Sequence, residues 1–123
     1  MNRPGQDIPA IDPREAERRL REDPDRPVLL DVREPDEFAV VRAPGAALFP
    51  TSTFLLRIDQ LPRDRPVLVI CRSGNRSAGV TDYLLRSGWT DVLNVAGGMN
   101  VWERLGLPVR RGAVGPEEGL LTD

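Results

Sequence analysis

The chain contains no histidine, no lysine and a single cysteine, Cys71, among its 123 residues. Without histidine or lysine it cannot build a Cys-His or Ser-His-Asp catalytic system, a lysine Schiff base, a histidine zinc site or a lysine-bearing P-loop. One cysteine also excludes an intramolecular disulfide and a Cys-x-x-Cys redox pair, so any sulfur bond that Cys71 makes must be to another molecule. A cysteine nucleophile in this chain would therefore have to be activated by its own loop.

The sequence also lacks a strong charge imbalance and a long apolar run. Its net charge of -2 at pH 7 gives no general attraction to nucleic acid or to an anionic membrane. No run approaches the length of a membrane span, and residues 1–7 lack the apolar core of a signal peptide. We therefore expect a cytoplasmic protein, and a reducing cytoplasm also suits a free thiol.

The length and composition indicate one folded domain. The 123 residues, with 40% hydrophobic and 29% charged side chains, suit a globule with a modest core. We expect a single domain over residues 1–123, with its core at about residues 8–109. Residues 110–123 are rich in Gly, Glu and Pro, which favours a flexible or loosely docked tail.

Short apolar runs alternate with helical patterns along the chain, a rhythm that is typical of βα units on a parallel sheet. We therefore expect an α/β fold. Asp12 followed by Pro13 predicts a helix start, because Asp is a favoured N-cap and Pro fits the first helical position. A second, brief helix is expected from Glu34. Strands are predicted at residues 28–31, 47–49, 67–70 and 92–95, and further helices at residues 51–61, 77–86 and 99–105.

The apolar strand predicted at residues 67–70 delivers Cys71 into a glycine-containing loop that opens a helix. Free amides at a helix N-terminus and the guanidinium groups of Arg72 and Arg76 favour the thiolate, which lowers the pKa of a cysteine below its usual ~8.5. Ligands in open α/β sheets bind at the carboxyl ends of strands, so Asp31 could face the same crevice. We expect the chemistry of this protein at Cys71.

Several motifs follow one another along the chain: Leu-Asp-Val-Arg-Glu-Pro-Asp-Glu-Phe at residues 30–38, Pro-Gly-Ala at 44–46, Cys-Arg-Ser-Gly-Asn-Arg-Ser at 71–77, Gly-Gly-Met-Asn-Val-Trp at 97–102 and Gly-Leu-Pro-Val at 106–109. In this order they resemble the motifs of the rhodanese sulfurtransferases, over roughly residues 8–109. One departure precedes the Pro-Gly-Ala, where members often have Gly-His-Ile and this chain has Val-Arg-Ala. The departure concerns contacts of that turn and leaves the cysteine motif intact.

The resemblance implies a three-layer α/β domain, with a central parallel sheet of about five strands flanked by helices on both faces. It also implies that Cys71 carries a persulfide in the loop of residues 71–76. In the expected reaction, the Cys71 thiolate takes the outer sulfur of a donor such as thiosulfate and passes it to cyanide or a thiol. We expect no metal and no organic cofactor. Both nucleophiles react as anions, so proton transfer is hardly required.

The loop amides from Arg72 to Ser77 are expected to curl around the sulfur as an anion-binding nest, and Gly74 permits a backbone conformation that a side chain would hinder. Arg72 and Arg76 could meet the sulfonate oxygens of thiosulfate through charge-assisted hydrogen bonds worth ~1.5 to 3 kcal/mol each. The expected substrate-binding residues are Arg72, Ser73, Gly74, Asn75, Arg76 and Ser77, with Asp31 and Arg33 in support.

Structural roles compete with these assignments. One loop arginine could brace the loop against a carboxylate instead of binding substrate. Asp31 fits a strand-end residue that caps a turn, and Arg33 fits an ion-pair partner of Glu37.

Two other functions stay open. Phosphatases and arsenate reductases related to this fold hold an oxyanion in a Cys-x5-Arg loop, whereas Arg76 arrives one residue early and no acid for a leaving alcohol is evident. Alternatively, Cys71 could take sulfur from a desulfurase and hand it to a protein partner, a relay that uses the same persulfide.

Overall fold

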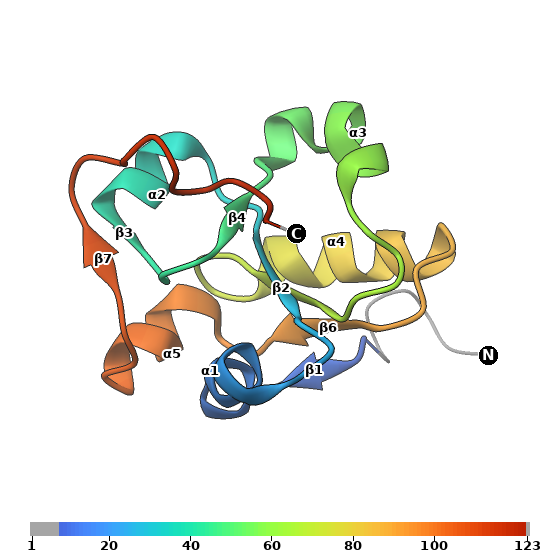
Figure 1. Ribbon diagram of the computed structural model, residues 1–123, viewed down its shortest axis with the longest axis horizontal. Coiled ribbons are helices and arrows are strands. Elements are labelled where there is room, and N and C mark those ends of the chain that lie inside the picture. Colours follow the sequence, from blue (N-terminus) through green and yellow to red (C-terminus); the bar gives the residue numbers. More distant parts are fainter. Residues whose placement is uncertain (1–7, 123) are drawn as a thin grey trace.

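A parallel sheet lies between two layers of helices in the computed structural model, which describes residues 8–122 (Figure 1). Residues 1–7, where the sequence predicts no signal peptide, lie outside the described residues. The strand order is β1-β6-β5-β2-β4, and all neighbours are parallel, which confirms the α/β prediction and its five-stranded sheet. The strands are β1 (Ala10–Ile11), β2 (Val28–Asp31), β4 (Ala47–Leu48), β5 (Val67–Ile70) and β6 (Val92–Val95).

The three central strands begin and end where the sequence predicts them. β2 and β5 are buried along their whole length, because helices cover both faces of the sheet. Their register pairs Leu30 with Val69, and β5 in turn pairs Val67 with Val92 of β6. The sequence did not predict β1, because two residues are too short to show a strand pattern.

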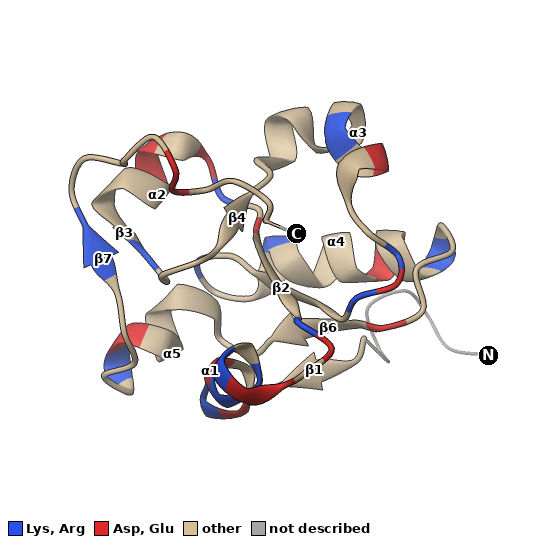
Figure 2. Cartoon of the chain, in the orientation of Figure 1, with Lys and Arg blue, Asp and Glu red and all other residues tan. Residues whose placement is uncertain are grey.

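The helices divide between the two faces of the sheet. α1 begins at Pro13, as predicted, and the Asp12 carboxylate accepts the Arg14 amide at 2.8 Å. Acidic and basic residues are interspersed along α1 (Figure 2). Helices α1 (Pro13–Glu22), α2 (Pro35–Val40) and α5 (Gly98–Arg104) pack on one face, and α3 (Phe54–Arg57) and α4 (Asn75–Arg86) on the other.

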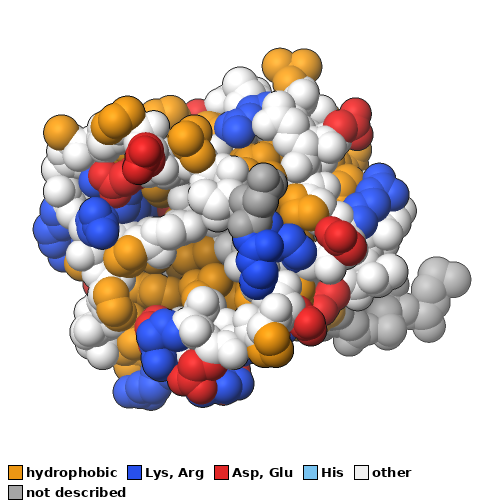
Figure 3. Space-filling model, viewed as in Figure 1, with side chains coloured by type: hydrophobic (Ala, Val, Ile, Leu, Met, Phe, Trp, Pro, Cys, Tyr) orange, Lys and Arg blue, Asp and Glu red, His pale blue; other side chains and the backbone are white. Residues whose placement is uncertain are grey.

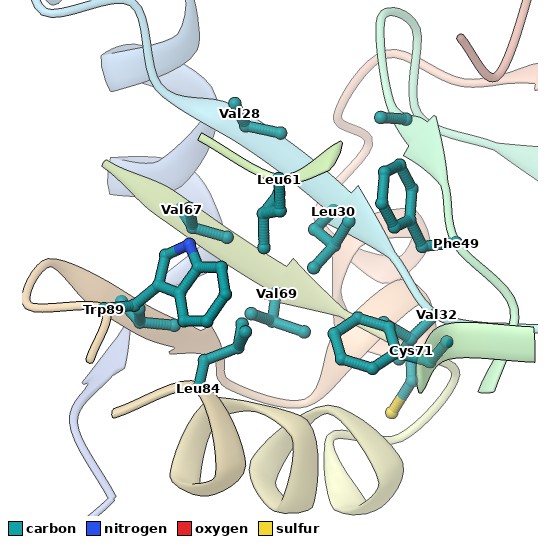
Figure 4. Close-up of a cluster of buried hydrophobic side chains, with 13 residues drawn as sticks. Val28, Leu30, Val32, Phe49, Leu61, Val67, Val69, Cys71, Leu84 and Trp89 are labelled. Atoms are coloured by element: carbon teal, nitrogen blue, oxygen red, sulfur yellow. The ribbon is translucent and has the colours of Figure 1, made fainter. Parts of the chain in front are cut away.

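Two buried clusters hold these layers together. On the α4 face, Leu84 and Phe54 pack with Val69, and Figure 4 shows this cluster running from Trp89 at one end to Cys71 at the other. On the opposite face, Phe38 of α2 and Trp102 of α5 pack against the other side of β5. The Cys71 sulfur therefore lies at the carboxyl end of a strand that both clusters fix in place.

Three of the predicted helices differ in extent from the structure, and the smallest difference is that α5 covers Gly98–Arg104 in place of residues 99–105. α4 begins at Asn75 and not at residue 77, because Gly74 adopts a φ of +102° and turns the chain directly into the helix. The helix expected over residues 51–61 is broken into a 3-10 turn (Thr51–Thr53), α3 and a second 3-10 turn (Ile58–Gln60).

The C-terminal segment is docked, in contrast to the flexible or loosely docked tail expected from its composition. Strand β7 (Arg110–Arg111) pairs antiparallel with β3 (Val41–Arg42). The buried Arg42 guanidinium contacts the Glu118 carboxylate at 2.6 and 2.8 Å and donates to the Gly112 carbonyl at 2.8 Å. Hydrogen bonds to one buried arginine thus hold a segment whose composition predicts a flexible or loosely docked tail.

The part of the chain that the structure describes contains no helix long and apolar enough to cross a membrane. The face of the molecule drawn in Figure 3 shows arginine and acidic side chains interspersed, and neither charge gathers into one patch there.

Candidate active site

Cys71 directly follows β5, and only 1% of its surface is exposed. Figure 4 shows its sulfur beyond the end of the strand, next to α4. Three donors converge on this atom: the Gly74 amide at 3.1 Å, the Ser77 amide at 3.3 Å and the Ser77 hydroxyl at 3.2 Å. The loop therefore surrounds the sulfur with hydrogen-bond donors at the N-terminus of a helix, an arrangement that favours a negative charge.

Burial and hydrogen bonding act on the Cys71 thiol in opposite directions. Burial raises the pKa of Cys71, because it removes water from the thiolate, whereas the Ser77 hydroxyl and the amides of Ser77, Gly74 and Ser73 lower it. The hydrogen bonds prevail, and the pKa of Cys71 lies below its ordinary value. The sulfur is thus both shielded from water and disposed to ionise, as a nucleophilic thiolate must be.

The start of α5 holds the cysteine loop through backbone hydrogen bonds. The Met99 amide donates to the Cys71 carbonyl at 2.8 Å, and the Asn100 amide donates to the Arg72 carbonyl at 2.9 Å. Gly98 lies so close to this backbone that a Cβ atom there would collide with the carbonyl oxygens of Cys71 and Arg72. Its φ of +57° also favours glycine. The Gly-Gly pair of the sequence therefore lets α5 fasten the first two peptides of the loop.

Arg76 braces the loop against a carboxylate, one of the two roles that the sequence left open. Its Nη1 and Nη2 atoms lie 2.7 and 2.8 Å from the two carboxylate oxygens of Glu37 on α2. This pairing, working against burial, lowers the pKa of Glu37 from its ordinary value of 4.5 to about 2. The same pair raises the pKa of the Arg76 guanidinium above its ordinary value.

Asp31 and Arg33 form a buried ion pair, with Arg33 Nη2 at 2.8 Å from Asp31 Oδ2. Arg33 also donates to the carbonyl oxygens of Val41 at 2.7 Å and Glu37 at 3.3 Å. The prediction that Arg33 pairs with the Glu37 side chain is wrong, because Arg76 occupies that carboxylate. Asp31 and Arg33 instead hold the backbone of the segment that carries Glu37.

Arg72 differs from Arg76 in its surroundings. Its side chain is exposed, and no hydrogen bond or ion pair joins it to another side chain among residues 8–122. It lines a surface cavity of about 300 Å³ together with Met99, Asn100 and Arg111. Ser73 and Asn75 are also exposed, whereas Gly74 and Ser77 are buried against the sulfur.

The sequence did not identify Asn94 as part of the site. This residue of β6 is buried, its Oδ1 lies 2.5 Å from the Ser77 hydroxyl oxygen, and its Nδ2 donates to the Gly74 carbonyl at 3.2 Å. A signal was present, because Asn94 is the single polar residue within the apolar strand of residues 92–95. Polar side chains in buried strands are expected to have a specific partner.

The site offers hydrogen-bond donors and cations around one sulfur. Within residues 8–122, no three His, Cys, Asp or Glu side chains gather in a way that could hold a metal ion.

The sequence matches the family described as Rhodanese-like domain over residues 12–105. A sulfurtransferase from Allochromatium vinosum is 40% identical over 82 residues, which cover 67% of this chain and 77% of that protein. Thiosulfate sulfurtransferase GlpE from Vibrio cholerae is 35% identical over 81 residues, which cover 66% of this chain and 76% of that protein. A solved rhodanese-related protein from Thermoplasma volcanium has a TM-score of 0.76 at 29% identity, over 84% of this chain and 98% of that protein.

Proposed function

The chain belongs to the rhodanese-like domain family and is a rhodanese-type sulfurtransferase, and from this premise we propose that it transfers sulfane sulfur through a persulfide on Cys71. The proposed donor is thiosulfate or a related small sulfur compound, and the proposed acceptor is cyanide or a thiol. The observation that carries the proposal is the convergence of three donors from Gly74 and Ser77 on the buried Cys71 sulfur.

The reaction proceeds in two displacements. The Cys71 thiolate attacks the outer sulfur of thiosulfate, a new sulfur–sulfur bond forms, and the bond within thiosulfate breaks as sulfite leaves with its electron pair. The negative charge then lies on the terminal sulfur of the Cys71 persulfide. In the second step, cyanide attacks that sulfur and leaves as thiocyanate, which regenerates the thiolate. Neither step transfers a proton or needs a cofactor.

The residues of the loop take different parts in this proposal. Cys71 is the nucleophile, and the amides of Ser73, Gly74 and Ser77 stabilise its negative charge. Arg72 binds the anionic donor, because its exposed guanidinium faces a cavity and has no ion-pair partner among the described residues. Arg76 holds the loop in shape through its ion pair with Glu37. Asn75 lies exposed at the start of α4, where it can contact a bound donor.

The geometry disfavours a phosphatase or arsenate reductase. A tetrahedral oxyanion needs a free arginine opposite the thiolate, and both terminal nitrogens of Arg76 are bound to the Glu37 carboxylate. The loop is also one residue shorter than the Cys-x5-Arg loop of those enzymes.

Mass spectrometry of the intact protein tests the proposal. Incubation with thiosulfate should add one sulfur atom, and cyanide should remove it with release of thiocyanate. Cys71→Ser should take up no sulfur, while Ser87→Ala, a change at the half-buried residue that caps the far end of α4, should load as the unchanged chain does. Sulfurtransferase turnover by Cys71→Ser, or release of phosphate from aryl phosphates that depends on Cys71, would contradict the proposed function.

The same assay compares sulfur donors. Thiosulfate, a glutathione persulfide and mercaptopyruvate are each offered to the protein at equal concentration, and the rate of persulfide formation is followed. Fastest loading from thiosulfate supports the proposed donor. If a desulfurase loads Cys71 and none of the small donors does, a protein relay becomes the better interpretation than free turnover.

A further inference from the structure

The Ser77 hydroxyl has one proton and two acceptors within reach. Its oxygen lies 3.2 Å from the Cys71 sulfur and 2.5 Å from Asn94 Oδ1. Two oxygens this close need a proton between them, because their lone pairs would otherwise repel each other. The hydroxyl that donates to the Cys71 sulfur is therefore shared with Asn94, and the shorter contact to Asn94 competes with the sulfur for the one proton.

The orientation of the Asn94 carboxamide is fixed by its other end. Asn94 Nδ2 donates to the Gly74 carbonyl at 3.2 Å, so the oxygen and not the nitrogen faces Ser77. A flipped amide would place Oδ1 against the Gly74 carbonyl, where neither atom has a proton. Asn94 is buried on β6, so water does not readily replace either contact.

We propose that Asn94 is a positioning residue that draws the Ser77 hydroxyl proton away from the Cys71 sulfur and thereby limits ionisation of the free thiol. A thiol can donate its own proton to the Ser77 oxygen, which completes a chain from sulfur through Ser77 to Asn94. A thiolate can only accept, so it has to draw the same proton that Asn94 holds. In the thiol, every hydrogen bond of this chain can form at once. In the thiolate, the sulfur and Asn94 compete for the single Ser77 proton.

Sulfur loading removes this competition. In the persulfide the negative charge lies on the terminal sulfur, and the inner sulfur of Cys71 is a weak acceptor. The Ser77 hydroxyl can then donate to Asn94 without giving up a hydrogen bond to a charged sulfur. Asn94 therefore favours the loaded cysteine over the bare thiolate.

Asn94 can be replaced without changing any of the charged groups around Cys71. Residues 92–95 of β6 and 98–101 of α5 carry no charged side chain. A substitution of Asn94 by an apolar residue thus changes the hydrogen bonding of Ser77 and leaves every charge in place. The charged groups near the loop are Arg76 of α4, Glu37 of α2, Arg72 of the loop itself, and Asp31 and Arg33 at the end of β2.

Titration of Cys71 in the whole chain tests the proposal. The thiolate is followed by its ultraviolet absorbance and by the pH profile of alkylation with iodoacetamide, in the unchanged chain and in Asn94→Leu. Leucine has the same branched skeleton of side-chain heavy atoms as asparagine, and the Gly74 carbonyl keeps the Ala78 amide at 3.1 Å. We expect the midpoint to move to lower pH in Asn94→Leu, with the thiolate fraction below the midpoint rising about threefold to tenfold.

Repeating the titration in a Ser77→Ala variant tests whether Asn94 acts through the Ser77 hydroxyl. In Ser77→Ala the hydroxyl is absent, so adding Asn94→Leu should leave the midpoint unchanged. Thr81→Val is the matched control, because the buried Thr81 hydroxyl donates to the Ser77 carbonyl at 2.8 Å without touching the sulfur. It should lower the melting temperature and leave the midpoint in place.

The proposal is overturned if Asn94→Leu leaves the midpoint unchanged, or if it shifts the midpoint equally in both backgrounds. Asn94→Ala gives the same test should the leucine variant not fold. The inference rests on the proposed function only in taking Cys71 as the nucleophile, and the titration needs no sulfur donor. A shifted midpoint without sulfur transfer would refute the proposed function alone, whereas normal sulfur loading with a fixed midpoint would refute this inference alone.

Discussion

Replacing Glu37 with glutamine should destabilise the protein above pH 5 and have little effect near pH 2. Glutamine retains the shape of the side chain, and its carbonyl can still accept the Glu34 amide that now donates to Glu37 Oε1 at 3.1 Å. The substitution therefore removes chiefly the negative charge that pairs with Arg76. What is lost is one ion pair between α2 and the cysteine loop.

The size of the effect follows from the pKa of Glu37. A fall from 4.5 to about 2 corresponds to at most about 3 kcal/mol of folding free energy, at ~1.36 kcal/mol for each pKa unit. Solvent reduces this value, because the side chains of Arg76 and Glu37 are 38% and 27% exposed. We expect a loss of about 1 to 2 kcal/mol at pH 7.

The pH dependence has a defined sign. The folded pKa of Glu37 is lower than the unfolded one, so the ionised carboxylate stabilises the fold above about pH 4.5. That stabilisation is lost as the pH falls from there toward 2. Urea unfolding of both proteins at several pH values between 7 and 3 should therefore show curves that converge as acid is added.

A matched control is Glu103→Gln, because Glu103 pairs with the largely exposed Arg111. It should lower stability by less than about 0.5 kcal/mol. A difference between Glu37→Gln and the unchanged chain that stays constant from pH 7 to pH 3 would refute the reasoning, since it would show that the carboxylate charge contributes nothing.

Three further changes address donor binding, loop support and the C-terminal segment. Arg72→Ala should cost ~1.5 to 3 kcal/mol in kcat/KM for thiosulfate, less for an uncharged donor, and leave the melting temperature unchanged; equal losses for all donors would contradict this. Gly98→Ala should lower stability by about 1 to 3 kcal/mol in urea unfolding, because its Cβ would meet the Cys71 carbonyl; unchanged stability would contradict the close approach. Arg42→Met should speed tryptic cleavage at residues 110–111, because it removes the contacts with Glu118, and unchanged cleavage would show that other contacts hold the segment.

The central strands could be predicted from the sequence because their signal is local. The runs at residues 28–31, 67–70 and 92–95 are short, largely apolar and flanked by polar or turn residues, as buried parallel strands are. The position of Cys71 at a strand end follows from the same runs. The broken helix at residues 51–60 was harder to predict, since its 3-10 turns depend on how the segment packs on the sheet.

The supports of the loop could not be predicted, because they join residues that are distant in the chain. Glu37 and Arg76 are 39 positions apart, and Arg42 and Glu118 are 76 apart. A sequence shows which charges exist but not which of them meet after folding. Asn94 reaches Ser77 only once α4 has packed on β6, so its role likewise depends on tertiary structure.

The docked C-terminal segment has a consequence for self-association. β4 is an outer strand of the sheet, and outer strands are where copies of a protein join into dimers or fibrils. Here Gly119 forms a parallel bridge with Ala47, and its carbonyl accepts the Leu48 amide at 2.8 Å. The segment thereby occupies backbone groups that a neighbouring molecule would need for pairing. Loss of residues 118–122 would expose these backbone groups of β4, so the segment covers an edge at which a second copy could otherwise pair.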